Sequence, residues 1–269
     1  NSSAASDVYK RQVQALCPGS DIAALLDKPN NNLAVEYCKA IIEQNVEMQP
    51  IALPRQGADH GQALTESAHA AFASASALRT LWAEGGAAAL APYVPEKALK
   101  LYIMTEYDGK YTDFAVMGHC ELALLRAACA GQAPFAAVRG VSEGLEHRLE
   151  NAVRETASLP ALLDALTTVR YPRARMRRLA MDAALGYTAQ TPALPPYLHL
   201  LGARKEALPL PGETALPLSH SLARLARENE TCAQMAAAQS RASDLGALCR
   251  AKPEPMGGIY RQKIIFLTN

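Results

Sequence analysis

Apolar residues recur at helical spacing along most of this 269-residue chain. From about residue 94 onward the pattern is almost entirely helical, so residues 91–269 are expected to form a mostly α-helical domain with short strands near its end. Residues 13–90 combine helix patterns with a strand pattern. Helices are predicted near residues 33–45 and 74–84, with a short strand at residues 50–54 between them. This order of helix, strand and helix suits the second half of a parallel α/β sheet.

Individual residues predict where the elements begin and which faces they bury. Leu33, Tyr37, Ala40 and Ile41 recur at i, i+4, i+7 and i+8, which predicts one buried face on the first helix. Further along, three residues are expected at helix starts and one at a helix end. Ser142 and Ser158 are placed as caps, and Pro172 and Gly186 bracket a helix over residues 173–185. Extended pieces are predicted near residues 197–203 and 259–267.

Composition narrows the class of protein without naming a partner. The chain is 49% hydrophobic and has 27 basic against 26 acidic residues, which is typical of a soluble globular protein. It has no apolar run of the roughly 18 residues that a membrane span needs and no secretory signal pattern, so we expect a cytoplasmic protein without a membrane partner. The six cysteines form no C-x-x-C pair and no cluster with histidine, which predicts neither disulfides nor a metal site.

The first twelve residues read differently from the rest. The chain does not start with Met, and SSAASDVYKRQ, residues 2–12, matches the translation of a common sequencing-library adapter. Residues 1–12 are therefore interpreted as an artefact and expected to be disordered. A genuine polar and disordered N-terminus is the alternative.

Two segments carry polar residues that could face a ligand. Asn30 and Asn31 come just before the first predicted helix, where one can cap the helix while freed backbone N–H groups meet a ligand. Arg55 directly follows the predicted strand, at the edge of a sheet where α/β domains bind ligands. For the asparagines, an ordinary helix cap is the simpler alternative.

A third segment adds a possible phosphate site. Ser74, Ser76 and Arg79 lie in FASASALR at the start of the predicted helix over residues 74–84. Unpaired N–H groups and the positive end of the helix dipole favour an anion at such a start. Serine is common at helix starts in any case, so this segment alone is a moderate signal.

The three segments together resemble the tRNA(Met) cytidine acetate ligases, a bacterial family related to nucleotidyltransferases. The stretches are KPNNNLAVEYCKAI, PIALPRQGADHG and FASASALRTLWAEGG. The resemblance implies the α/β remnant of a Rossmann-like nucleotidyltransferase domain, followed by a mostly α-helical domain. It implies ATP contacts from Asn30, Asn31 and Arg55, and from the serine-rich helix start with Arg79. Mg²⁺ is expected with the ATP of an intact enzyme.

One family feature is absent from these residues. The family should open with a strand and an H-x-G-H loop that handles the ATP phosphates, and no two of the six histidines have that spacing. The chain is therefore expected to be a C-terminal portion with little activity of its own, and its catalytic residues stay unassigned. In the intact enzyme the resemblance implies activation of acetate by ATP and transfer of the acetyl group to N4 of the wobble cytidine of elongator methionine tRNA.

A basic stretch predicts the RNA contacts. VRYPRARMRRL contains five arginines and no acidic residue, with Tyr171 among them. Met176, Leu179 and the alanines that follow share one helical face, so most of the arginines should point outward. Phosphate contacts and stacking on an aromatic ring are how single-stranded RNA is held. The candidate tRNA-binding residues are Arg170, Tyr171, Arg173, Arg175, Arg177 and Arg178.

Three interpretations stay open at this point. The arginines could be only a solvated surface. The chain could be a nucleotidyltransferase of another specificity, because a serine-rich helix start is shared across that superfamily. It could also act purely as a helical RNA-binding module.

Overall fold

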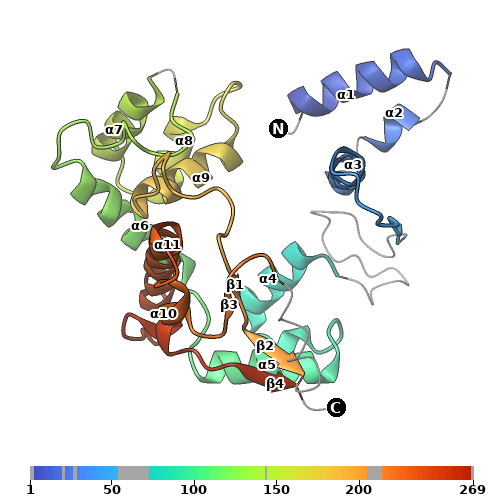
Figure 1. The fold of residues 1–269 in the computed structure, drawn as a ribbon. Helices are drawn as coiled ribbons and strands as arrows, with labels where there is room; N and C mark the ends of the chain where they lie inside the picture. The colour runs from blue at the N-terminus through green and yellow to red at the C-terminus, as the bar shows by residue number, and fades with distance from the viewer. Residues whose placement is uncertain are drawn as a thin grey trace. The chain divides into compact units, whose positions relative to one another are not determined.

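The computed structural model describes residues 3–19, 22–26, 29–53, 73–142, 144–204 and 214–267. The chain divides into two compact units, residues 1–77 and residues 78–269. Figure 1 shows the elements of both units, and each unit is considered by itself below.

The regular structure described in the first unit is all helical. It contains α1 (Ser3–Leu16), α2 (Ile22–Leu25) and α3 (Pro29–Glu43), and α4 (Ala75–Gly85) begins at its end. The strand predicted at residues 50–54 is wrong for residues 50–53, which have no regular structure. A strand needs a partner for its backbone groups. The described residues of this unit contain no other strand that could supply one.

Two further expectations for the first unit are corrected. The predicted burial of one face of α3 is wrong for Leu33 and Tyr37, which are 53% and 63% exposed, because this unit has no described sheet for that face to cover. The expected disorder is also not found for residues 3–12, which lie in α1, a helix that contacts α2. Alanine, lysine, arginine and glutamine in α1 are good helix formers, which outweighs its polar composition.

The second unit begins with a short aromatic cluster. The helix predicted at residues 74–84 is found as α4, and a 3-10 turn, η1 (Ala87–Leu90), leads to α5 (Glu96–Tyr107). The Glu106 carboxylate accepts hydrogen bonds from Trp82 Nε1 at 2.9 Å and from the backbone N–H of Ala87 at 3.0 Å. Tyr102 packs edge-on against the Trp82 ring, with the centroids 5.2 Å apart. These contacts fix the end of α4 against α5.

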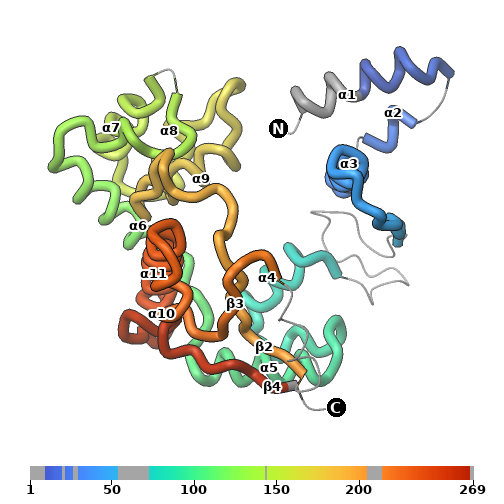
Figure 2. Tube along the Cα trace, viewed as in Figure 1, coloured from blue at the N-terminus to red at the C-terminus, as the bar shows by residue number. Residues whose placement is uncertain are grey.

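Four consecutive helices form the main core of the second unit. They are α6 (Phe114–Ala128), α7 (Leu145–Glu155), α8 (Leu159–Leu166) and α9 (Arg173–Ala184), drawn in green to yellow in Figure 2. Their buried side chains form one cluster: Leu122, Leu125, Phe135, Leu145, Leu149, Ala152, Val153, Leu162, Leu163, Leu166, Met176, Leu179, Ala180 and Ala183. Phe135 reaches this core from the loop between α6 and α7.

The cap predictions for this bundle had mixed outcomes. Ser158 caps α8, and its Oγ accepts the backbone N–H of Ala161 at 3.3 Å. The prediction that Ser142 caps α7 is wrong, because this helix starts at Leu145 and its cap is Gly144 with φ 77°. Glycine adopts this left-handed conformation without a steric cost, so the helix begins there.

The last part of the unit contains the strands. β1 (Leu198–His199) pairs in parallel with β3 (Leu218–Ser219), and β2 (Gly202–Arg204) pairs in parallel with β4 (Ile265–Leu267). α10 (Leu222–Leu225), α11 (Glu230–Leu248) and the 3-10 turn η4 (Gly258–Arg261) complete it. The extended pieces predicted near residues 197–203 and 259–267 thus contain short strands, and part of the second is the turn η4.

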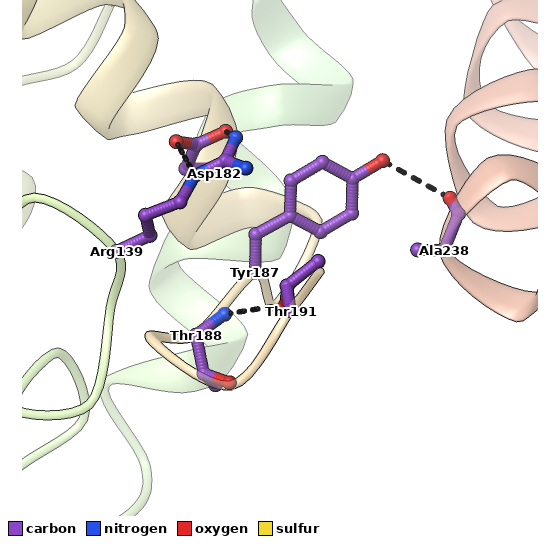
Figure 3. A network of polar contacts seen from close by, with 6 residues as sticks. All are labelled: Arg139, Asp182, Tyr187, Thr188, Thr191 and Ala238. Carbon is purple, nitrogen blue, oxygen red and sulfur yellow. Dashed lines mark hydrogen bonds and ion pairs between the residues drawn. The ribbon is translucent and has the colours of Figure 1, made fainter. Parts of the chain in front are cut away.

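A polar network joins the bundle to α11 (Figure 3). Arg139 donates to both carboxylate oxygens of Asp182 on α9, at 3.1 and 2.9 Å. The Tyr187 ring lies against the guanidinium groups of Arg139 and Arg241, and its hydroxyl donates to the backbone carbonyl of Ala238 on α11 at 3.1 Å. Tyr187 therefore ties the end of α9 to the middle of α11.

Candidate nucleotide and RNA sites

The first candidate nucleotide segment lies inside a helix. Asn30 and Asn31 were expected to precede and cap it, but α3 begins at Pro29, so both lie in its first turn. Proline is favoured at the first helical position, which explains the earlier start. The Asn31 side chain donates to the backbone carbonyl of Leu25 at 2.7 Å, while Asn30 is exposed. The neighbouring Asn32 has a buried Oδ1 without a hydrogen-bond partner among the described residues.

The serine-rich segment lies at a helix start, as predicted. Ser74 is 6% exposed and its Oγ accepts the backbone N–H of Ala77 at 3.2 Å, which caps the first turn of α4. Ser76 is half-buried and Arg79, three residues later on the helix, is exposed. Residues three apart lie on one side of a helix, so Ser76 and Arg79 are neighbours on α4.

Arg55, the third predicted nucleotide contact, lies outside the described residues. Its predicted contact with ATP therefore stays a prediction.

The arginine face is the better described candidate. We use this name for Arg170, Arg173, Arg175, Arg177 and Arg178, which lie on α9 or just before it. Arg175 is half-buried and the other four are exposed. The opposite side of α9 is buried, with Met176 and Ala180 fully covered. The predicted helix and the predicted division between its two faces are both found.

Tyr171 stands at the start of the arginine face with two cations over its ring. The guanidinium carbons of Arg170 and Arg175 lie 5.7 and 5.1 Å from the ring centroid. A turn fixes the backbone, because the N–H of Tyr171 donates to Thr168 Oγ1 at 3.0 Å and its carbonyl accepts the N–H of Thr168 at 3.0 Å. The aromatic ring is thus held among positive charges, as a site for RNA phosphates and bases would require.

Two arginines of this face have acidic neighbours that the sequence pattern did not indicate. Arg173 forms an ion pair with Asp164 of α8, and both side chains are about half or more exposed. Arg177 lowers the pKa of Glu121 on α6, but burial has the larger effect and raises that pKa from 4.5 to about 7. Glu121 is 1% exposed and its Oε1 has no hydrogen-bond partner in the described part of the chain.

Residues 2–256 match the model of the HIGH Nucleotidyl Transferase family. The match includes nearly the whole chain. The chain belongs to this family.

Curated relatives narrow the position within the HIGH nucleotidyl transferases. The tRNA(Met) cytidine acetate ligase of Listeria monocytogenes serotype 4b (strain CLIP80459) is 31% identical over 183 residues, which are 67% of this chain and 45% of the relative. The enzyme of the same name from Streptococcus mutans is 31% identical over 176 residues, covering 65% of this chain and 43% of the relative. This confirms the resemblance seen in the motifs. The chain spans about half the length of the curated relatives that it matches.

Solved structures agree on the fold. Apo TmcAL of Thermotoga maritima superposes with a TM-score of 0.81 at 20% identity, covering 98% of this chain and 66% of that one. The same protein bound with alpha-thio ATP gives a TM-score of 0.79 at 19% identity, again over 98% and 66% of the two chains. The predicted fold class, part of a nucleotidyltransferase-type α/β domain followed by a mostly helical domain, is confirmed.

None of the described helices is long and apolar enough to cross a membrane. Among the described residues, no group of three or more histidine, cysteine, aspartate or glutamate side chains could hold a metal ion. All six cysteines are free thiols; Cys232 and Cys249 are buried, three others are half-buried and Cys17 is exposed.

Proposed function

We propose that the chain is the ATP- and tRNA-binding portion of a tRNA(Met) cytidine acetate ligase that works in the cytoplasm. The observation that carries the proposal is the 31% identity over 183 residues to a protein of that name. The arginine face with Tyr171 supports the RNA part. The alpha-thio ATP in a structural neighbour supports the nucleotide part.

The reaction has two steps. A carboxylate oxygen of acetate attacks the α-phosphorus of ATP, the α–β phosphoanhydride bond breaks, and acetyl-adenylate and pyrophosphate form. The N4 amine of the wobble cytidine then attacks the acetyl carbon and AMP leaves. No covalent enzyme intermediate is needed. The product is N4-acetylcytidine in elongator methionine tRNA.

Residues of this chain would hold the nucleotide and stabilise charge on the leaving pyrophosphate. The first turn of α4 offers backbone N–H groups, and Arg79 on the same helix offers a guanidinium for phosphate oxygens. Asn30, Asn31, Arg55, Ser74 and Ser76 complete the proposed ATP set, and Mg²⁺ would accompany the bound ATP and neutralise part of its phosphate charge. Positive groups placed where charge develops are a large source of catalysis in phosphoryl chemistry.

The nucleotide part is tested by binding of a fluorescent ATP analogue. Arg79→Ala should weaken binding about 10- to 100-fold, the effect of losing one charge-assisted hydrogen bond. Arg227→Ala removes another exposed arginine and should leave binding unchanged. Acetate-dependent ATP–pyrophosphate exchange by this chain should stay near background, because none of its residues forms the H-x-G-H loop. Exchange at the rate of a full-length relative would contradict this expectation.

The RNA part is tested by filter binding of elongator methionine tRNA over a range of salt concentrations. Arg175→Ala with Arg178→Ala should weaken binding and flatten the log–log salt dependence by about two units, one for each lost phosphate contact. Loss of the Arg175 contact with Tyr171 should cost about 1 kcal/mol of stability. Arg224→Ala with Arg227→Ala is the matched control, because both side chains are exposed and lie after the bundle. Equal affinities for the two double variants would reduce the arginine face to a solvated surface.

The two assays also separate the rival functions. A nucleotidyltransferase of another specificity would bind ATP, and the arginine substitutions would not affect its tRNA affinity. A helical RNA-binding module would bind tRNA without binding ATP. The proposed function requires both activities in one chain.

A further inference from the structure

A small pocket lies beside the arginine face, between the starts of three helices. Its volume is about 310 Å³. Phe114 and His119 of α6 line one side, Leu159 and Leu163 of α8 line the other, and Arg173 of α9 completes it. This volume is at the lower end of the roughly 300–1,000 Å³ of ligand pockets, which suits a single ring system.

The chemistry of the lining is that of a site for a flat, partly polar ring. Phe114 is 75% exposed and lines the pocket, so its aromatic ring is open to solvent. His119 Nδ1 lies 2.8 Å from the carbonyl oxygen of Ala115. A carbonyl can only accept, so the hydrogen bond is donated by Nδ1–H of the ring. The Ser158 hydroxyl on the other side can donate.

The rim of the pocket favours a phosphate rather than a cation. In the described part of this unit no acidic side chain lines the pocket, and Arg173 does. Its pairing with Asp164 is solvent-exposed, with the two side chains 49% and 69% exposed, so the pairing is weak and its exchange for a phosphate costs little. Arg173 is also a member of the arginine face. An RNA strand that follows this face would therefore carry a phosphate to the mouth of the pocket.

We propose that this pocket binds one unpaired base of the RNA that the arginine face holds, with the base stacked on Phe114 and its phosphate on Arg173. The inference rests on the proposed RNA-binding function and adds a specific recognition of single-stranded RNA to it. Stacking on an exposed aromatic ring accepts bases of any identity, because each base has a π face. An apolar side chain of a protein partner could fill the space but would make no use of Arg173.

Two RNA probes test the proposal. One is a hairpin with 2-aminopurine in an unpaired loop, and the other is a blunt duplex with the same stem sequence. Wild-type protein should bind the hairpin more tightly and quench its fluorescence. Phe114→Ala should weaken hairpin binding about 5- to 100-fold and abolish the quenching, which is the range found when a stacking aromatic is lost. Its duplex affinity and salt slope should not change, because no charge is removed.

Controls make the outcomes distinct. Phe114→Trp should keep both affinity and quenching. Leu194→Ala, which removes an apolar side chain that is 79% exposed and does not line the pocket, should behave as wild type. Wild type and Phe114→Ala could both show the same salt-dependent binding to hairpin and duplex. That result would overturn the proposed base site in the pocket and leave the proposed role of the arginine face unaffected. No binding of either RNA by wild type would overturn the proposed function, and the pocket with it.

Discussion

Replacing Glu121 with glutamine is expected to raise the free energy of unfolding by about 3 kcal/mol at about pH 8, and to change it little at pH 4.5. Glu121 is 1% exposed, and burial raises the pKa of its carboxyl from 4.5 to about 7 despite the opposing effect of Arg177. Above pH 7 the folded protein must hold a buried negative charge whose Oε1 has no partner among the described residues. Glutamine fills the same space without a charge.

The direction of this change in stability depends on whether the folded or the unfolded protein holds the Glu121 proton. Between pH 4.5 and 7 the folded protein keeps the Glu121 proton while the unfolded chain releases it, so stability falls as the pH rises through this window. Urea unfolding followed by circular dichroism at several pH values measures the effect. The difference between wild type and Glu121→Gln isolates this carboxyl from all other titrating groups.

A matched variant controls for the lost charge. Glu155→Gln removes an exposed carboxyl from α7 of the same bundle and should change stability by less than about 0.5 kcal/mol. Arg177→Ala removes the cation that opposes the pKa rise, so it should extend the loss of stability to higher pH. Identical pH profiles for wild type and Glu121→Gln would mean that the Glu121 carboxylate is solvated in the folded protein.

The sequence pattern predicted α8 and α9 well because their signals are local. Ser158 supplies a cap and Pro172 precedes the first residue of α9. An apolar stripe of four residues fixes which side of α9 is buried, and the arginines then have only the other side. These features need no knowledge of the rest of the chain.

The errors lie where a distant or missing partner decides the structure. The strand at residues 50–54 and the buried face of α3 were predicted from periodicity, but both need neighbouring strands that the first unit does not have among its described residues. Asn30 and Asn31 were read as caps because asparagine is a good cap, and Pro29 took the first position of the helix instead. The preferences of single residues cannot decide which of two adjacent positions begins a helix.

Residues that matter to the core or the pocket were missed for the same reason. Glu121 is the only carboxylate in the largely apolar helix α6, a pattern that indicates a buried charge rather than a site motif. Phe114 and Arg173 are 59 positions apart, and only the fold brings them to one pocket. Phe135 lies in an irregular loop without periodicity, so no pattern marks it as core.

Phe135→Ala is expected to lower the free energy of unfolding by about 3–5 kcal/mol. The ring is 1% exposed and packs into the cluster formed by α6 to α9, and no neighbour can fill the space it leaves without moving a helix. Such a loss is a large part of the roughly 5–15 kcal/mol that stabilises a typical domain. Denaturant unfolding measures it directly.

The effect of Phe135→Ala on tRNA binding shows whether Phe135 supports the fold or contacts the RNA. The arginine face lies on α9, whose buried side shares the core with Phe135, so Phe135→Ala should bind tRNA normally at low temperature and lose binding on warming, when α9 loses its support. For the stability measurement Phe114→Ala is the matched control, because its ring is 75% exposed and its removal should cost less than about 0.5 kcal/mol of stability. Equal stability of the two variants would mean that the loop bearing Phe135 does not anchor the bundle, and that α9 is held by the facing helices alone.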